Sequence, residues 1–273
     1  MNRAARILSP EVVRACAARL HEAERTRRQI GQLTLEYRGM TIEDAYAIQR
    51  AWVELKLGEG RRLRGRKIGL TSRAMQQSSQ IDEPDYGDLL DDMFFEDGSD
   101  IPASRFIVPR VEVELAFVLK DRLSGPNCTL DEALAATEYI VPALEIIDAR
   151  IVQVDPATQV TRKVEDTISD NAANAGLVLG KRRIAPRDVD LRWIAAICSR
   201  NDIIEESGVA AAVLNHPANG IAWLANKLFQ HGVTLDAGLV VLSGSFVRPI
   251  PARAGDRFVA DYGPHGSISC RFV

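Results

Sequence analysis

The chain has 273 residues, of which 46% are hydrophobic and 26% are charged, and its formal net charge is -3 at pH 7. This composition is that of a globular protein and excludes disordered, collagen-like and membrane-embedded classes. The 34 basic and 37 acidic residues are nearly balanced, and no basic stripe interleaved with aromatic residues occurs, which excludes nucleic acid as a partner. Neither a signal peptide nor an apolar run of about 18 residues is recognisable, so we expect a cytoplasmic protein with no membrane partner.

Cysteine and histidine spacing gives no sign of a zinc site. The cysteines lie far apart at Cys16, Cys128, Cys198 and Cys270, as buried or free thiols do. The four histidines show neither HxH nor HxxxH spacing. Candidate chemistry is therefore sought among carboxylate, lysine and hydroxyl side chains.

Helix signals dominate the beginning of the chain. A Ser-Pro-Glu capping signal opens a predicted helix over about residues 9–30. A second helix is predicted to begin after a hydroxyl cap at Thr41 and to continue, with apolar residues at helical spacing, to Gly58. These signals predict a helical N-terminal lobe over residues 1–62.

The sequence texture changes after this lobe to short apolar or β-branched runs separated by Gly, Pro and Asp. The runs are RKIGL, FIVPRVEVELAFVL, YIVPALEIIDARI, AGLVLG, GLVVLSGSF and FVADY. Two helices interrupt them, one from Thr129 and one over residues 216–232, where a glycine ends the pattern. Because strands and helices do not alternate regularly, we expect an α+β fold with a mixed β-sheet over residues 63–273.

Residues 81–100 form the most acidic segment, with nine acidic residues and no basic one. Acidic runs are usually solvated loops. The segment also contains Met93, Phe94 and Phe95, which are seldom exposed together. We therefore expect a folded loop that covers part of the core.

Two glutamates alternate within a predicted strand. Glu112 and Glu114 are two residues apart in RVEVELAFVL, so their side chains leave the same face, about 6.6 Å apart at Cα. Two such carboxylates raise each other's pKa unless a cation lies between them. An exposed polar face on a half-solvated sheet would produce the same alternation, so this pattern alone leaves both interpretations open.

A third glutamate favours the metal interpretation. Glu145 interrupts the apolar run YIVPALEIIDAR, where an isolated charge requires a partner. Three carboxylates without His or Cys are typical of Mg²⁺ or Mn²⁺ sites, and they leave coordination positions open for water and substrate. Asp148 follows as a candidate supporting group.

Other polar residues are candidates for the same site. Lys67 lies between glycines before an apolar pair, where it could bind an anion or move a proton, although a surface lysine fits equally well. Ser169 and Asn171 precede a predicted strand and also fit an ordinary capped turn. The small-residue turn that begins at Ser243 could hold a carboxylate through its backbone N–H groups.

Long motifs in a fixed order carry a family resemblance over nearly the whole chain. They are GRKIGLTS, EPDYGDLLDDMF, PRVEVELAFVL, PALEIIDARI, DTISDNAANAG, HPANGIAWLANKL and GSISCRFV. In this order they resemble the hydratase and decarboxylase branch of the fumarylacetoacetate hydrolase-like superfamily. The resemblance implies a mixed β-sheet roll with flanking helices, bound Mg²⁺, and homo-oligomers such as pentamers or decamers.

The resemblance also implies roles for individual residues. It places the metal ligands at Glu112, Glu114 and Glu145 and the family's glycine-flanked lysine at Lys67. Asp85 of the EPDYG motif falls where relatives carry an acid used in proton transfer. The motif DTISDNAANAG implies substrate contacts at Ser169 and Asn171.

The activity implied by the resemblance is hydration of an unsaturated 2-oxo acid, with 2-oxohept-4-ene-1,7-dioate as the expected substrate. Hydration of 2-oxopent-4-enoate and decarboxylation of 4-oxalocrotonate, a 2-oxo-3-enedioate, remain alternatives. A C–C bond hydrolase is disfavoured because that branch uses a His–Glu pair, and a non-catalytic partner subunit has no use for three converging carboxylates. The distal carboxylate of a dioate requires a cation, for which Arg73 is a first candidate.

Overall fold

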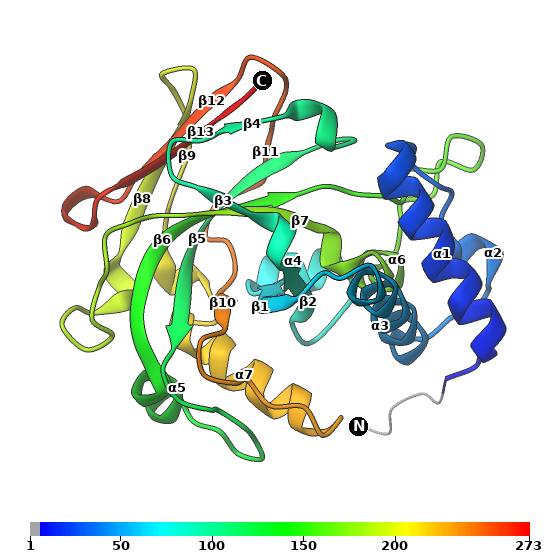
Figure 1. The fold of residues 1–273 in the computed structure, drawn as a ribbon, viewed down its shortest axis with the longest axis horizontal. Helices are drawn as coiled ribbons and strands as arrows, with labels where there is room; N and C mark the ends of the chain where they lie inside the picture. Colours follow the sequence, from blue (N-terminus) through cyan, green and yellow to red (C-terminus); the bar gives the residue numbers. More distant parts are fainter. Residues whose placement is uncertain (1–5) are drawn as a thin grey trace.

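The computed structural model describes residues 6–273, which form two β-sheets with helices packed around them (Figure 1). The helices are α1 (Pro10–Thr26), α2 (Leu33–Glu36), α3 (Ile42–Gly58), α4 (Arg73–Ser78), α5 (Leu130–Ala136), α6 (Val164–Ser169) and α7 (Pro217–Phe229). Short 3-10 turns are η1 (Asp91–Met93), η2 (Ala103–Arg105), η3 (Asn171–Ala173), η4 (Leu191–Trp193), η5 (Ala210–Ala212) and η6 (Gly263–His265). Within this described part of the chain, no helix combines the length and apolar character needed to cross a membrane.

The larger sheet has eight strands. They are β1 (Leu63–Gly69), β2 (Asp85–Leu90), β3 (Phe94–Glu96), β5 (Arg110–Leu119), β6 (Thr137–Ile147), β7 (Asn174–Leu179), β10 (Val240–Leu242) and β11 (Ile250–Pro251). Their order is β2-β1-β10-β5-β6-β7-β3, and β11 pairs with β5. Two pairs, β1 with β10 and β3 with β7, are parallel and the others are antiparallel, so the predicted mixed sheet is confirmed.

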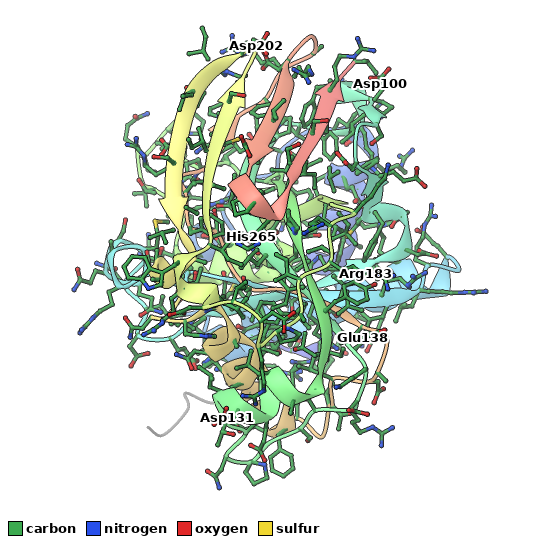
Figure 2. The ribbon with its side chains drawn as sticks, turned by 90° about the vertical axis from the view of Figure 1, so that its left-hand side faces the viewer. Asp100, Asp131, Glu138, Arg183, Asp202 and His265 are labelled. Atoms are coloured by element: carbon green, nitrogen blue, oxygen red, sulfur yellow. The ribbon has the colours of Figure 1, made fainter. Side chains whose placement is uncertain are left out.

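The smaller sheet has five strands, β4 (Asp100–Ile101), β8 (Ala195–Arg200), β9 (Ile203–Val209), β12 (Arg257–Asp261) and β13 (Ser267–Phe272), in the order β4-β13-β12-β8-β9. The hairpin of β8 and β9 was not predicted. Figure 2 places its turn, at Asp202, at the same end of the molecule as Asp100 and opposite Asp131 of α5.

The Tyr262 hydroxyl joins the two sheets, because it lies 2.8 Å from the carbonyl oxygen of Glu114 and 2.9 Å from that of Ala143.

The caps predicted for the first helices are present. The Ser9 hydroxyl accepts from the N–H of Val12 at the start of α1, and Thr41 and Asp44 form a reciprocal capping box at the start of α3. Helix α1 is shorter than predicted, because the chain turns into the left-handed conformation at Arg27. Local hydrogen bonding therefore sets where both helices begin.

Helix α3 lies against the edge of the larger sheet. The Gln49 side chain donates to the carbonyl oxygen of Tyr86 in β2 at 2.7 Å and lies 3.3 Å from that of Ile168 in α6. The rings of Tyr46 and Tyr86 stack with centroids 4.4 Å apart. These contacts tie the N-terminal helices to β2, and the division of the chain at residues 62 and 63 stays a prediction.

The prediction that residues 81–100 form a loop is wrong. This segment contains β2 and β3, which lie at the two edges of the larger sheet. Every residue of β2 is buried, including Asp85 and Asp88, and Asp88 is paired with Arg66 on the neighbouring strand β1. Pairing with cations from β1 allows acidic residues to occupy a buried strand, which their sequence alone does not indicate.

Helix α7 ends as predicted at a glycine. Gly232 has a φ of +70°, and the N–H groups of Gly232 and Val233 donate to the carbonyl oxygens of Phe229 and Leu228. Near its start, Gly220 lets the helix approach the turn after β10, since a Cβ atom there would lie 3.1 Å from the carbonyl oxygen of Ser243. The helix therefore supports the turn that follows β10.

Candidate metal centre

Three glutamates meet on neighbouring strands of the larger sheet. Strands β5 and β6 are antiparallel, and Glu112 lies directly opposite Glu145, with Glu114 two residues further along β5. One carboxylate oxygen from each of the three lies within 4.8 Å of the others. Glu114 and Glu145 are 1% and 0% exposed, whereas Glu112 is partly exposed. Strand alternation thus brings all three carboxylates together on one side of the sheet.

The electrostatics of this cluster favour a bound cation. Burial, followed by the charge of Glu145, raises the pKa of Glu112 to about 8. Burial and the charges of Glu145 and Glu112 raise the pKa of Glu114 well above its ordinary value. A divalent cation between the carboxylates would remove this cost, because it stabilises their charged forms.

Unpartnered oxygen atoms provide an independent test of whether a metal fits. Within residues 6–273, Oε1 of Glu114 and Oε2 of Glu145 are buried without a hydrogen-bond partner. Buried carboxylate oxygens are normally satisfied, so an atom that accepts nothing indicates a missing ligand. A set of carboxylate oxygens without imidazole or thiolate is the donor set of Mg²⁺ or Mn²⁺. The three glutamates therefore fit such an ion.

The remaining oxygens of the two buried glutamates are held in place. The N–H of Gly244 donates to Oε2 of Glu114 at 2.8 Å, and Nδ2 of Asn174 donates to Oε1 of Glu145 at 2.8 Å. Gly244 has a φ of +112°, and a Cβ atom there would lie 2.5 Å from Thr71, so only glycine fits without strain. These two contacts leave one oxygen of each glutamate free for a metal.

Sequence reasoning found Gly244 but not Asn174. The turn beginning at Ser243 was expected to hold a carboxylate by backbone N–H groups, and the carboxylate that it holds belongs to Glu114. Asn174 is the first residue of β7 and is fully buried. An asparagine at the start of an apolar strand was the only signal for it.

Lys67 and Asp85 lie beside the glutamates. Both are buried, on the paired strands β1 and β2, and Nζ of Lys67 is 3.4 Å from Oε1 of Glu145. A Cβ atom at Gly69 would collide with Oδ1 of Asp85 and would lie 3.1 Å from Nζ of Lys67. Gly69 therefore allows the lysine and the aspartate to approach each other.

The pKa values of Lys67 and Asp85 are shifted by burial and by the charges of the neighbouring side chains. Burial lowers the pKa of Lys67, but the carboxylates, led by Glu145 and Asp85, outweigh it and hold the pKa above its ordinary value. Burial raises the pKa of Asp85, although Lys67 opposes that shift. Oδ1 of Asp85 is buried with no hydrogen-bond partner among the described residues. The site thus contains a lysine whose charged form is favoured and an aspartate whose charged form is disfavoured by its surroundings.

The other predicted site residues lie in different surroundings. The Ser243 hydroxyl is buried next to Gly244 and has no hydrogen-bond partner in residues 6–273. The Ser169 hydroxyl donates to the carbonyl oxygen of Glu165, within its own helix. The Asn171 side chain exchanges two hydrogen bonds with the backbone of Asp88 and so clamps β2. Their roles in binding substrate stay predictions.

Two further candidates do not join the cluster. Both oxygens of Asp148 accept from the backbone N–H groups of Ile107 and Val108, which fixes the loop before β5 and does not orient a metal ligand. Arg73 is exposed at the start of α4. Neither residue is within the group of side chains that could hold the metal.

Comparison with known proteins agrees with this geometry, although no family model matches the chain. The chain is 66% identical to the 2-oxo-hept-4-ene-1,7-dioate hydratase of Escherichia coli over 257 residues, which are 94% of this chain and 96% of that protein. It is 41% identical to the 2-hydroxyhexa-2,4-dienoate hydratase of Comamonas testosteroni, over 93% of this chain and 95% of that one.

A solved structure extends the agreement to the fold. The 4-oxalocrotonate decarboxylase from Pseudomonas putida G7, complexed with magnesium and adipate, matches with a TM-score of 0.93 and 33% identity, over 98% of this chain and 100% of that chain. On these identities and this coverage, the chain belongs to the hydratase and decarboxylase branch of the fumarylacetoacetate hydrolase-like superfamily.

Proposed function

We propose that the protein is a Mg²⁺-dependent hydro-lyase. Its substrate is 2-oxohept-4-ene-1,7-dioate or the 2-hydroxy-2,4-diene tautomer, and its product is 4-hydroxy-2-oxoheptane-1,7-dioate, in the meta-cleavage catabolism of aromatic compounds. The 66% identity to a hydratase of this name supports the substrate, since the identities to 4-oxalocrotonate decarboxylases are 34% and 33%.

The observation that carries the metal dependence is the pair of unpartnered oxygens on Glu114 and Glu145 beside Glu112. These three residues would hold Mg²⁺, and Mn²⁺ suits the same ligands. When bound, the ion supplies Lewis acidity that stabilises negative charge on the 2-oxo oxygen of the substrate. The magnesium present in the related decarboxylase structure supports this assignment.

Lys67 would stabilise the same developing charge. Its ammonium group lies 3.4 Å from Oε1 of Glu145 and is only 4% exposed, so its field acts in a medium from which water is largely excluded. Four carboxyl groups surround it and keep it protonated. We therefore assign Lys67 to binding anionic oxygen and not to accepting a proton.

Asp85 is the candidate for proton transfer. In the reaction, the enol gives up its hydroxyl proton while C5 receives one, which places a double bond between C3 and C4 in conjugation with the ketone. Water then adds its oxygen to C4, and a proton goes to C3. A carboxyl group with a raised pKa and a free oxygen atom, as Asp85 has, can both deliver and receive such protons.

Decarboxylation is the second candidate, favoured by the TM-score of 0.93 to a 4-oxalocrotonate decarboxylase. The same electron sink at the 2-oxo group assists loss of CO₂ from a suitably placed carboxylate. The two reactions differ in their products and in the substrate that each requires.

Product analysis tests both candidates. The purified protein is incubated with 2-hydroxyhepta-2,4-dienedioate and Mg²⁺, with an EDTA control, and separately with 4-oxalocrotonate. We expect 4-hydroxy-2-oxoheptanedioate to form from the diene only when metal is present. Release of CO₂ from 4-oxalocrotonate, with no hydration of the diene, would instead assign the protein as a decarboxylase.

We also propose that the protein is a cytoplasmic homo-oligomer, a pentamer or a decamer. Large apolar side chains are exposed at both ends of the β8–β9 hairpin, where Trp193 is 74% exposed at one end and Ile203 and Ile204 are 68% and 65% exposed at the other. Apolar groups of this size on a surface are typical of protein interfaces. Light scattering after size-exclusion chromatography tests the oligomer, and cell fractionation tests the location.

A further inference from the structure

The glutamate cluster is more open at one end than at the other. Along β5 the residues on the cluster's face change from buried Glu114 through partly exposed Glu112 to exposed Arg110. Along β6, buried Glu145 is followed on the same face by partly exposed Ile147, which pairs with Arg110. The side chains on this face of the two strands are therefore more exposed towards the Arg110 end than at Glu114 and Glu145.

A cavity of about 80 Å³ lies at this open end. Arg110, Ile147 and Arg162 contribute to its lining, with Gln29 and Gln153. A larger cavity of about 370 Å³ lies elsewhere, between α1, α3 and the loop before β5, and its lining includes none of the three glutamates. The lining of the smaller cavity also includes none of the three glutamates, but Arg110 and Ile147 in its lining lie two residues from Glu112 and Glu145 on the same strands.

Two arginines line this cavity together with Asp148, whose two oxygens already accept from the backbone N–H groups of Ile107 and Val108. Within residues 6–273, neither Arg110 nor Arg162 forms an ion pair, although Arg162 donates to the carbonyl oxygen of Ile151 at 3.2 Å. Burial lowers the pKa of Arg162, and Arg150 and Arg110 lower it further, against the opposing effect of Asp170 and Asp166. Two guanidinium groups that repel each other across a cavity create a site for an anion.

We propose that Arg110 and Arg162 bind the distal carboxylate of a dicarboxylic 2-oxo acid whose other end occupies the metal centre. This proposal rests on the proposed function and deepens it by naming the residues that select a dioate. Arg110 lies two residues from Glu112, about 6.6 Å along the strand, which is the scale of an extended chain of several carbon atoms. Guanidinium groups suit a carboxylate because they bind it through paired N–H donors.

Arg110 and Arg162 of this cavity, and not Arg73, therefore supply the positive charge that the distal carboxylate of a dioate requires. A monocarboxylic substrate such as 2-oxopent-4-enoate has no group to place between the two arginines and would leave them unpaired. A hydrogen bond to a charged group contributes enough binding free energy that removing either arginine should weaken binding of the dioate about tenfold to a hundredfold. The pair therefore acts on specificity and not on the chemical step.

Binding of saturated analogues tests the proposal without turnover. Calorimetry with Mg²⁺ present measures the affinity of 2-oxoheptanedioate and of 2-oxoheptanoate, which share the end that faces the metal and lack the reacting double bond. The variants are Arg110→Met, Arg162→Met and the double variant. Lys163→Met is the matched control, because Lys163 is an exposed cation adjacent to Arg162 that does not line the cavity.

We expect the unaltered protein to bind the dioate at least tenfold more tightly than the monoacid. Each arginine variant should weaken the dioate about tenfold and leave the monoacid within twofold, and the double variant should lose the preference. Equal weakening of both ligands, or no change relative to Lys163→Met, would overturn the proposal. If Arg162→Met disturbs the loop it supports, Arg110→Met still decides, since Arg110 is exposed.

Failure of the proposed function gives a different result. If the protein prefers the dioate and the arginine variants remove that preference, the subsite stands even when no diene is hydrated. The opposite result is that the protein hydrates the diene while the Arg110 and Arg162 variants bind both analogues as the unaltered protein does. The hydratase assignment would then stand, and the role of the two arginines would be disproved.

Discussion

Arg150 and Asp170 form a buried ion pair whose side chains are each 1% exposed. Arg150 donates to the Asp170 side chain, to the carbonyl oxygen of Asp170 at 2.5 Å and to that of Asn174 at 2.9 Å. In the glutamate cluster, by contrast, four carboxyl groups surround the single ammonium group of Lys67 and several oxygens have no partner.

The difference separates a structural buried charge from a functional one. The Arg150 pair is complete within the chain, so its contribution is to stability. The cluster is incomplete, and in the absence of a cation its carboxyl groups must hold protons or repel one another. A buried charge that lacks a partner therefore indicates a ligand, whereas a buried charge that is fully paired does not.

Breaking the complete pair should have the largest effect on folding. Asp170→Asn removes the carboxylate that is ion-paired with buried Arg150, and we expect the free energy of unfolding to fall by about 3–5 kcal/mol. Urea denaturation measures this. The control is Asp236→Asn, which breaks the exposed pair of Arg122 and Asp236 and should cost less than about 1 kcal/mol. Similar losses in the two variants would contradict the comparison.

Breaking the incomplete cluster should remove activity and spare folding. Glu114→Gln should lower Mg²⁺-dependent turnover more than about 100-fold, the upper range for loss of a group that merely orients a metal ligand. Metal-free stability should not fall, because the change removes one of the four carboxyl groups that crowd around the single ammonium group of Lys67. Glu138→Gln, on the exposed part of β6 labelled in Figure 2, is the control and should keep full activity. Retained activity in Glu114→Gln would disprove the role of the cluster.

Displacing the Gly244 N–H group, which holds the expected metal ligand Glu114, should have an intermediate effect. Gly244→Ala strains a backbone at φ +112° and presses on Thr71, which displaces the N–H that holds Glu114. We expect Mg²⁺ affinity to fall about 10- to 100-fold. Gly255→Ala is matched to it, since Gly255 has a φ of +93° with open space around its Cβ position, and it should affect stability alone. An equal loss of Mg²⁺ affinity in both variants would contradict the proposal that the Gly244 N–H group holds Glu114 in place.

The smallest effect is the dependence on pH. The pKa of Glu112 in the folded, metal-free protein is about 8, above its ordinary 4.5, so its contribution to stability is present below pH 4.5 and is lost as pH rises towards 8. Metal binding displaces the proton, so apparent Mg²⁺ affinity should fall at most about tenfold per pH unit and per proton as pH decreases below 8. Thermal shift with and without Mg²⁺ checks both trends, and Mg²⁺ stabilisation that is constant from pH 6 to pH 8 would contradict them.

Several elements could be predicted from the sequence because their signals are local. The caps at Ser9 and Thr41, the glycine stop at Gly232 and the alternation that puts Glu112 and Glu114 on one face all follow from a few neighbouring residues. The apolar surroundings of Glu145 and the glycines around Lys67 also mark these residues as candidates, the family resemblance adds Asp85, and all three lie beside those glutamates. The substrate roles assigned to Ser169 and Asn171 remain predictions.

Other features could not be predicted because their partners are distant in sequence. Strand β2 was mistaken for a loop, since its aspartates look solvated until Arg66 and Lys67 lie beside them. The sequence does not indicate the β8–β9 hairpin, because much of the surface of its two strands is exposed and they carry no long apolar run. Asp148 and Arg73 are site candidates by position in the sequence alone, and position says nothing of what their side chains contact.

The sequence by itself determined the class of fold, the strands that carry the glutamates and the shared face of Glu112 and Glu114, because strand periodicity is a property of adjacent residues. Tertiary structure alone decided that Gly244 holds Glu114 across 130 residues, that Asn174 holds Glu145 and that two arginines face one cavity. Sheet order brings these residues together, and order depends on burial and pairing over the whole chain.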